Sequence, residues 1–321
     1  MTDTEVLFLR SDELSGLATF PDYIDAVREG YREVGDGAPA EPRTKLVNES
    51  PPGMLTGYMA VLPETGAMGG YTYAAGFGDR DAHFLLPLFD AESGRPVALL
   101  DGASLNPFKT GAAGGVAADE LARPDATDLA LFGSGAQARG QLRAAAAVRD
   151  IETVEVYSPT KEHRESFAAE MNGALDASVA AVASPDAAVE GADIVVTATN
   201  AGEPVFDGEM LDPGTHVTVM GQYDAGKREV DATTVERATY VPDLRARAHQ
   251  DAGAFLAAVE AGPGHPGPLP PPPGLVLARV GGGGARREGD TPFSSGRARI
   301  EAGPAPHQIS RPAHGRGAGG D

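Results

Sequence analysis

The sequence predicts an α/β protein built around a doubly wound parallel sheet, and two observations carry that prediction. From about residue 128 onward, short apolar runs alternate with segments of helical periodicity, which is typical of parallel strands connected by helices. The first run, at residues 128–132, ends in a glycine loop that opens directly into an alanine-rich helix. We therefore expect a Rossmann-type domain, preceded by an α+β domain and followed by an atypical tail rich in proline, glycine and arginine.

The N-terminal α+β domain is expected over residues 1–118. Residues 20–31 have helical periodicity, with a proline near the start, where a helix tolerates it. Residues 83–89 and 96–101 have the composition of strands, and turn-forming residues separate them at 90–94. This spacing predicts a β-hairpin.

The Rossmann domain is expected over residues 119–262. One helix is predicted at residues 161–171, and the last convincing one at residues 250–260. The strands of the parallel sheet are predicted at residues 128–132, 153–157, 178–182, 193–198 and 215–220.

The tail, residues 263–321, differs from everything before it. Its 59 positions hold 11 prolines and 14 glycines, with seven arginines against four acids. The runs at residues 270–273 and 281–284 cannot support a packed core. Two interpretations are open: a disordered basic tail, or a reading-frame error in a GC-rich gene, because shifted GC-rich codons encode this mixture. We favour the frame error, since the sign of the charge changes abruptly.

The glycine loop has the form G-x-G-x-x-A that binds dinucleotides. Gly133 permits the tight turn, and Gly135 lets the backbone approach a pyrophosphate. The following helix N-terminus offers unpaired N–H groups and a partial positive charge. We therefore predict a bound nicotinamide dinucleotide, with Ser134, Ala136 and Gln137 beside the two glycines in its binding loop.

The choice between NAD and NADP depends on the residues after the second strand. An NAD site usually has an acid there for the ribose hydroxyls, but this chain has Ser158, Thr160 and Lys161. Hydroxyls and an ammonium group suit a 2′-phosphate, so the sequence favours NADP over NAD.

Composition excludes several classes of site and partner. The chain has no cysteine, so disulfides and thiolate catalysis are excluded. Acidic residues number 46 against 26 basic ones, for a net charge of −20, which disfavours nucleic acid and anionic membranes as partners. This charge suits a high-salt cytoplasm; the alternative is an ordinary acidic enzyme from a GC-rich genome.

Neither a membrane anchor nor a metal site is expected. No apolar run approaches the roughly 18 residues that span a bilayer, and the N-terminus lacks the pattern of a signal peptide. His83 and His216 have no partner at ligand spacing. We expect a cytoplasmic protein without a bound metal.

Several segments together carry a family resemblance. They are Pro-Leu-Phe-Asp-Ala-Glu-Ser-Gly at 87–94, Ala-Leu-Leu-Asp-Gly at 98–102, Lys-Thr-Gly-Ala-Ala at 109–113, the loop Gly-Ser-Gly-Ala-Gln-Ala, and residues 220–231. With these motifs the chain resembles the ornithine cyclodeaminase/mu-crystallin family, which also contains archaeal alanine dehydrogenase and imine reductases. The resemblance implies a two-domain homodimer. It also implies that the first domain supplies the substrate groups and the dimer surface, and that a small amino or imino acid binds between the domains.

The resemblance also implies individual site residues. Arg43 and Lys109 match positions that bind the substrate carboxylate, although the family usually has an arginine where Lys109 stands. Tyr71 replaces the family's catalytic lysine, and Tyr223 replaces its catalytic aspartate, with Asp224 one step further. We take Lys109, Asp224 and Tyr71 as the catalytic candidates. Further cofactor contacts are expected from residues at or after the ends of two later strands, namely Thr197, Thr199 and Gly221.

The two tyrosines that replace the family's catalytic residues distinguish between ornithine cyclisation and imine reduction. Ornithine cyclisation uses the family's aspartate to handle the amine, whereas imine reduction needs a hydride, a carboxylate clamp and one acid. We therefore expect an NAD(P)-dependent oxidoreductase acting on the C–N bond of a small amino or imino acid, similar to alanine dehydrogenase or an imine reductase. Two alternatives stay open: ornithine cyclodeaminase, and a crystallin-like protein that binds NADPH without turnover.

Overall fold

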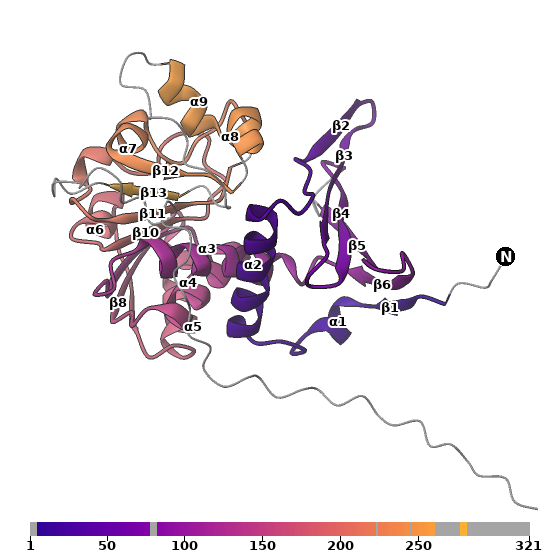
Figure 1. Cartoon of the computed structure of the whole chain (residues 1–321). Coiled ribbons are helices and arrows are strands. Elements are labelled where there is room, and N and C mark those ends of the chain that lie inside the picture. Colours follow the sequence, from indigo (N-terminus) through magenta and orange to yellow (C-terminus); the bar gives the residue numbers. More distant parts are fainter. Residues whose placement is uncertain (1–4, 78–81, 223, 244, 261–276, 281–321) are drawn as a thin grey trace, which may run out of the picture. The chain divides into compact units, whose positions relative to one another are not determined.

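The computed structural model describes residues 5–77, 82–222, 224–243, 245–260 and 277–280. These residues belong to one compact unit, residues 1–283, and contain two sheets with their helices (Figure 1). In the described part of the chain, no helix is both long and apolar enough to cross a membrane.

The first sheet has six strands in the order β1-β6-β5-β4-β3-β2. β1 runs parallel to β6, and every other neighbouring pair is antiparallel. The strands are β1 Leu7–Leu9, β2 Thr44–Glu49, β3 Pro52–Leu62, β4 Ala67–Ala75, β5 Ala82–Asp90 and β6 Pro96–Asp101. The pairing of β5 with β6 confirms the predicted hairpin.

Two helices lie between β1 and β2 in the chain. The short α1 covers Ser11–Leu14, and α2 covers Phe20–Gly35. The Thr19 side chain caps α2 by accepting a hydrogen bond from the backbone N–H of Asp22, and Pro21 follows in the first turn. The predicted helix is therefore present and continues four residues beyond Tyr31.

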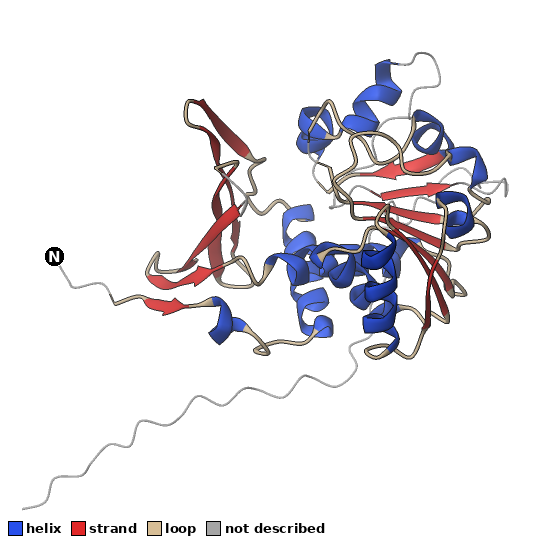
Figure 2. Ribbon diagram, turned by 180° about the vertical axis from the view of Figure 1, so that it is seen from behind, coloured by secondary structure: helices blue, strands red, loops and turns tan. Residues whose placement is uncertain are grey.

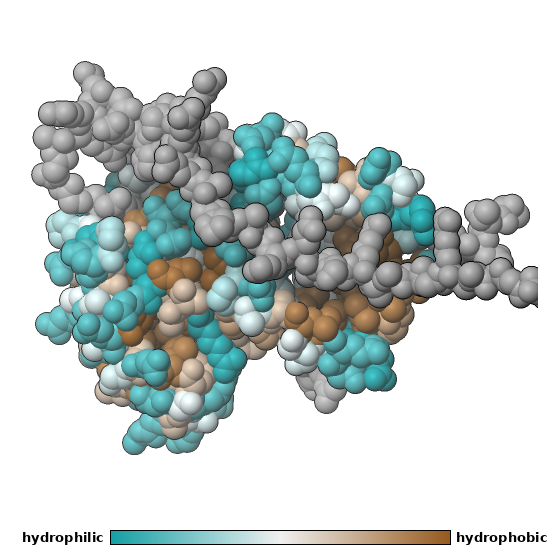
Figure 3. Space-filling view, turned by 60° about the horizontal axis from the view of Figure 1, so that its bottom comes forward, coloured by the Kyte–Doolittle hydropathy of each residue, from teal (hydrophilic) through white to brown (hydrophobic). Residues whose placement is uncertain are grey.

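Alternation along β3, β4 and β5 gives the first sheet two different faces. One is an aromatic face, formed by Tyr58, Tyr71, Tyr73 and Phe84, which stack or contact edge-on across the strands. The opposite, outer face carries exposed apolar side chains: Leu55, Met59, Leu85 and Val97 are 46–68% exposed. Apolar groups reach the surface of the molecule beside strongly hydrophilic ones (Figure 3).

The second sheet has seven strands in the order β12-β13-β11-β10-β7-β8-β9 (Figure 2). The five strands from β11 to β9 are parallel, whereas β13 is antiparallel to both β11 and β12. The strands are β7 Asp128–Phe132, β8 Thr153–Tyr157, β9 Ser178–Ala181, β10 Ile194–Thr197, β11 His216–Val219, β12 Ala238–Val241 and β13 Leu277–Val280. All five predicted parallel strands are present, some shorter by one or two residues.

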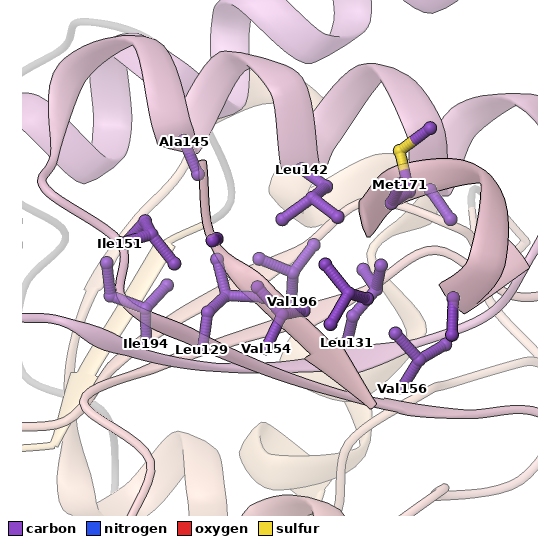
Figure 4. Close-up of a cluster of buried hydrophobic side chains, with 14 of the residues drawn as sticks. Leu129, Leu131, Leu142, Ala145, Ile151, Val154, Val156, Met171, Ile194 and Val196 are labelled. Atoms are coloured by element: carbon purple, nitrogen blue, oxygen red, sulfur yellow. The ribbon is translucent and has the colours of Figure 1, made fainter. Parts of the chain in front are cut away.

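Helices pack on both faces of this sheet, which confirms the doubly wound prediction. Leu129 and Leu131 of β7 join one core with α4 and α5, whereas Ala130 and Phe132 join the opposite core. Figure 4 shows the first core, where Leu142 and Met171 lie over the branched side chains of the strands. The helices are α3 Asn106–Leu121, α4 Ala136–Val148, α5 Lys161–Asn172, α6 Pro185–Val189, α7 Ala232–Arg237, α8 Arg245–Asp251 and α9 Gly253–Glu260, with a 3₁₀ turn at Gly208–Met210.

Three features of the structure differ from the domain and helix boundaries that the sequence predicts. Helix α3 continues through the expected domain boundary at 118/119. The single helix expected at 250–260 is two helices, α8 and α9, and a side chain at Gly253 would lie 2.1 Å from the carbonyl oxygen of Lys227. Within the expected tail, residues 277–280 form β13; the rest of the tail lies outside the described residues.

Glycine contacts fix α3 against α4. A Cβ at Gly111 would lie 2.5 Å from the carbonyl oxygen of Gly140, and one at Gly140 would lie 2.3 Å from that of Pro107. Gln141, which is buried, donates from its side-chain amide to the Thr110 carbonyl at 2.8 Å. The beginning of α3 is therefore held against α4, the helix that follows the glycine loop.

Candidate active site

The glycine loop connects β7 to α4, and its two glycines serve different purposes. Gly133 has a φ of +116°, and a Cβ there would lie 2.4 Å from the Ala198 carbonyl oxygen. Gly135 is the N-cap of α4 with a φ of −86°, and a Cβ there would meet nothing within 4 Å. The fold therefore requires glycine at 133 but not at 135. At 135 the missing side chain leaves open space at a helix N-terminus, which fits a pyrophosphate.

An open pocket of about 390 Å³ adjoins this loop, lined by Ser134, Gly135, Arg139, His163 and Ser166. Arg139 donates to the Ser134 carbonyl at 2.8 Å and forms an ion pair with Glu170 at 2.6 Å. These contacts hold the loop in place.

The other loop positions differ in exposure. Ala136 is exposed, whereas the Oε1 atom of Gln137 is buried and has no hydrogen-bond partner within the described structure. A buried oxygen of this kind is available to a donor on a bound ligand. Gly135, the pocket and this oxygen are together consistent with a dinucleotide at the loop.

The residues after β8 approach the same pocket. Ser158 is buried, and its Oγ lies 3.1 Å from Ser134 Oγ. Thr160 is the exposed N-cap of α5. Lys161 is exposed, with its Nζ 3.7 Å from Glu165, and Arg164 donates to the Ser158 carbonyl at 2.9 Å. The structure thus brings Ser134 and Ser158 together and leaves Lys161 at the surface.

Glu229 organises the ends of β10 and β11, and the sequence analysis missed it. Its carboxylate accepts hydrogen bonds from Thr197 Oγ1 at 3.0 Å, from the N–H and Oγ1 of Thr199 at 2.6 and 2.7 Å, and from the Gly221 N–H at 2.6 Å. Burial raises the pKa of Glu229, and these four hydrogen bonds oppose that rise. Three predicted cofactor residues therefore share one buried carboxylate. Its only sequence signal was its place in the segment 220–231.

Lys109 lies over the aromatic face of the first sheet. Its Nζ is 4.8 Å from the Tyr71 ring centroid and 5.3 Å from that of Tyr58, and it donates to Tyr58 Oη at 2.9 Å. Tyr58 and Tyr71 are direct cross-strand partners. The structure thus brings the candidates Lys109 and Tyr71 together, with Tyr58, which the sequence analysis did not single out, as a third member of the group.

Tyr71 is poorly suited to act as an acid. It is buried, and burial raises the pKa of its phenol above the ordinary value of 10.0. Its hydroxyl donates to the Gly102 carbonyl at 3.4 Å. A Cβ at Gly102 would lie 2.7 Å from the Tyr71 ring, so the turn after β6 is shaped around this tyrosine.

Arg43 is buried just before β2 and contacts a residue of the second domain. Its Nη2 lies 2.6 Å from Asp251 of α8, and its Nη1 lies 3.5 Å from the Tyr73 hydroxyl. Asp251 also lies 3.8 Å from Arg247, which pairs with Asp243 at 2.8 Å. Arg43 therefore lies beside the aromatic face, and Asp251 partly neutralises its charge.

Asp224 lies at the surface. Its side chain accepts a hydrogen bond from the Gly226 N–H at 2.9 Å, and its carbonyl accepts one from Lys227. It is exposed. The neighbouring Tyr223 lies outside the described residues. Among the described residues, no group of three or more His, Cys, Asp or Glu side chains is placed to hold a metal ion; His216 is buried beside Thr218 Oγ1 at 3.0 Å.

Comparison with known proteins identifies the family. The model of the ornithine cyclodeaminase/mu-crystallin family matches residues 5–260. The chain belongs to this family. The resemblance inferred from the motifs is therefore confirmed, as is the α/β fold with its Rossmann-type domain.

Individual relatives support the same assignment. The chain is 38% identical over 164 residues to a Δ1-pyrroline-2-carboxylate reductase of Bacillus cereus, a match covering 51% of this chain and 50% of the relative. The chain thus spans about half the length of the first curated relatives that it matches.

Solved structures match over more of the chain. A Thermococcus litoralis Δ1-pyrroline-2-carboxylate reductase in complex with NADH and L-proline has a TM-score of 0.76 at 30% identity, covering 80% of this chain and 81% of that one. An archaeal alanine dehydrogenase dimer with bound NAD has a TM-score of 0.74 at 28% identity, covering 80% of each chain.

Proposed function

We propose that this chain is an NAD(P)-dependent oxidoreductase that acts on the C–N bond of a small amino or imino acid, with reduction of a cyclic imino acid as its principal reaction. One observation carries the proposal: the glycine loop and Lys109 are fixed to each other, because Lys109 lies in the first turn of α3, the helix that packs through glycines onto α4. The relatives named above, a pyrroline-2-carboxylate reductase and an alanine dehydrogenase, act on substrates of this class.

The bound dinucleotide would supply the hydride, and the chain's own residues would position the substrate. Lys109 and Arg43 lie beside the same aromatic face and offer two positive charges for one carboxylate. The buried rings of Tyr71 and Tyr73 would form the apolar side of the substrate site. Tyr71 and Asp224 remain the other proposed catalytic residues, Tyr71 as a hydrogen-bonding group rather than an acid.

The proposed dinucleotide is NADP in preference to NAD. The support is that Ser158, rather than an acid, follows β8, and that Lys161, His163 and Arg164 bring positive or ionisable nitrogen groups to the first turn of α5. Positively charged groups of this kind would stabilise the 2′-phosphate of NADP. Titration of the purified protein with each cofactor should give the lower Kd for NADPH, and a lower Kd for NADH would reverse this assignment.

We also propose a cytoplasmic homodimer adapted to high salt. The exposed apolar outer face of the first sheet would be covered by a second copy, and the archaeal alanine dehydrogenase structure is a dimer. The net charge of −20 would be screened by salt. Light scattering in low and high KCl should show twice the 32.9 kDa chain mass in high salt.

The function is tested by following cofactor absorbance at 340 nm. Reduction of Δ1-pyrroline-2-carboxylate should consume NADPH or NADH, with slower consumption for pyruvate plus ammonia. Formation of proline and ammonia from ornithine, without net cofactor consumption, would instead identify a cyclodeaminase. Tight cofactor binding with no turnover of any of these compounds would identify a crystallin-like binding protein.

A further inference from the structure

Tyr58 and Lys109 form a hydrogen-bonded pair with a defined direction. An ammonium group has only donors, so at 2.9 Å Lys109 Nζ donates and Tyr58 Oη accepts. The phenol keeps its own proton, which it can give to another acceptor. Tyr71, its cross-strand partner, instead directs its hydroxyl to the Gly102 carbonyl.

We propose that Tyr58 is the proton donor to the substrate nitrogen, and that Lys109 stabilises the phenolate that remains. This inference rests on the proposed function and names the acid which that reaction needs. Tyr58 is half-buried, whereas Tyr71 and Tyr73 are buried, so Tyr58 is the most accessible of the three tyrosines on the aromatic face.

One cation contacts the Tyr58 hydroxyl directly, and a second interacts with it electrostatically. Lys109 reaches it from α3, and its ring stacks on Tyr71 of β4 with centroids 5.8 Å apart. Arg247 of α8 also interacts electrostatically with Tyr58, whereas the interaction with the Tyr31 phenol of α2 is of the opposite sign. Burial lowers the pKa of Arg247, but Asp243, Asp251 and Tyr58 raise it, so this guanidinium stays charged.

Asp243 and Asp251 form ion pairs with Arg247, which partly offsets its effect on the phenol. Lys109, in direct contact, is therefore the main stabilising charge. An ammonium at hydrogen-bond distance gives a charge-assisted bond, about twice as strong as a neutral one.

The proposed step balances in atoms and electrons. As the imine carbon accepts the hydride, the π pair of the C=N bond moves to nitrogen and forms an N–H bond with the Tyr58 proton. The O–H bond of Tyr58 breaks, and the phenolate is reprotonated from water. In the direction of amino-acid oxidation, the same phenolate accepts the proton.

The test compares Tyr58→Phe with a control variant, Tyr23→Phe. Phenylalanine at 58 keeps the ring that stacks on Tyr71 and removes only the hydroxyl. Tyr23 stacks on Phe108, next to Lys109, with centroids 5.2 Å apart. Two substrates are used: Δ1-pyrroline-2-carboxylate, which needs a proton on nitrogen, and its N-methyl iminium derivative, which does not.

Tyr58→Phe should lower kcat for the imine by about 100-fold or more, the usual contribution of a general acid. It should leave kcat for the N-methyl iminium, KM, and the Kd values for NADPH and L-proline measured by calorimetry unchanged. Tyr23→Phe should behave as wild type with both substrates.

Equal loss on both substrates would show that the Tyr58 hydroxyl only positions the substrate, and no loss on either would show that it has no role; both results overturn the inference. If the wild-type chain reduces neither substrate, the proposed function is wrong and the inference falls with it.

Discussion

Replacing Gly135 by aspartate is expected to weaken dinucleotide binding strongly while leaving the fold intact. Gly135 is the N-cap of α4, with φ −86° and ψ −172°, and a Cβ there meets nothing within 4 Å. Aspartate is among the preferred N-cap residues. It also restricts the unfolded chain more than glycine does, by about 0.4–1 kcal/mol on the scale of Gly→Ala. The free energy of unfolding of the unliganded protein should therefore stay the same or rise slightly.

The cost of Gly135→Asp falls on the ligand. A carboxylate about 4 Å from a phosphate charge is repelled by about 4 kcal/mol at an effective dielectric constant of 20. The affinity for NADPH or NADH should therefore fall by at least about 100-fold, since about 1.4 kcal/mol corresponds to a factor of ten. Calorimetric titration measures the affinity, and urea unfolding of the unliganded protein measures the stability.

Gly133→Ala is the matched control, because there the protein itself needs glycine. At φ +116° an alanine is strained, and its Cβ would lie 2.4 Å from a backbone oxygen. Left-handed backbone costs about 1–2 kcal/mol, and overpacking costs about 1–3 kcal/mol more, so we expect a loss of about 2–5 kcal/mol in unfolding free energy. Wild-type cofactor affinity in Gly135→Asp, or equal destabilisation by both variants, would refute this reasoning.

Three further predictions concern other parts of the structure. In Glu229→Gln, an amide NH₂ group would face two hydrogen-bond donors, Thr197 Oγ1 and the Gly221 N–H, which would lose their acceptor. The variant should therefore lose about 1–3 kcal/mol of unfolding free energy at neutral pH. Burial raises the pKa of Glu229 above 4.5. The stabilisation that Glu229 gives the folded protein is therefore complete below pH 4.5 and declines as the pH rises through the raised pKa. The difference in unfolding free energy between wild type and Glu229→Gln, measured by urea unfolding, should therefore shrink with rising pH. Asp251→Asn removes the charge that pairs with buried Arg43 and should cost about 3 kcal/mol in thermal unfolding, whereas Asp36→Asn, in an exposed pair, should cost less than about 1 kcal/mol; equal losses would contradict the assigned burial. Met59→Lys, on the outer face where Met59 is 68% exposed, should yield monomers by light scattering without loss of monomer stability; an unchanged dimer would place the interface elsewhere.

Much of the fold follows from local sequence patterns. The apolar runs of the parallel sheet are short and bounded by helices. The apolar pattern and the residues that end each run were therefore enough to predict both ends of β7, β8 and β10 to within one residue. The split of α8 and α9 could not be predicted, because it depends on the packing of Gly253 against the distant turn at Lys227. Likewise, β13 lies in a segment whose composition argues against any packed structure.

The candidate site was predicted less completely than the fold. The sequence analysis singled out Gly133, Lys109 and Tyr71 because motifs mark these positions. Glu229 and Asp251 were missed because a buried acid looks like any other acid in sequence. Their burial depends on distant partners: Thr197 and Thr199 lie 32 and 30 residues from Glu229, and Arg43 lies 208 residues from Asp251.

Tyr58 was missed for a related reason. The role that we propose for it depends on the β3–β4 register, which sets it opposite Tyr71, and on the helix that carries Lys109 over both rings. Neither relation is visible in the spacing of residues along the chain.

The most direct test of the account is the fate of the transferred hydride. The purified protein would be incubated with Δ1-pyrroline-2-carboxylate and NADPH or NADH carrying deuterium at C4 of the nicotinamide, in each stereochemical form. We predict L-proline with one deuterium at Cα from one of the two forms. Proline without deuterium at Cα from every labelled cofactor, or no proline at all, would contradict the assignment of this chain as a reductase of the C–N bond.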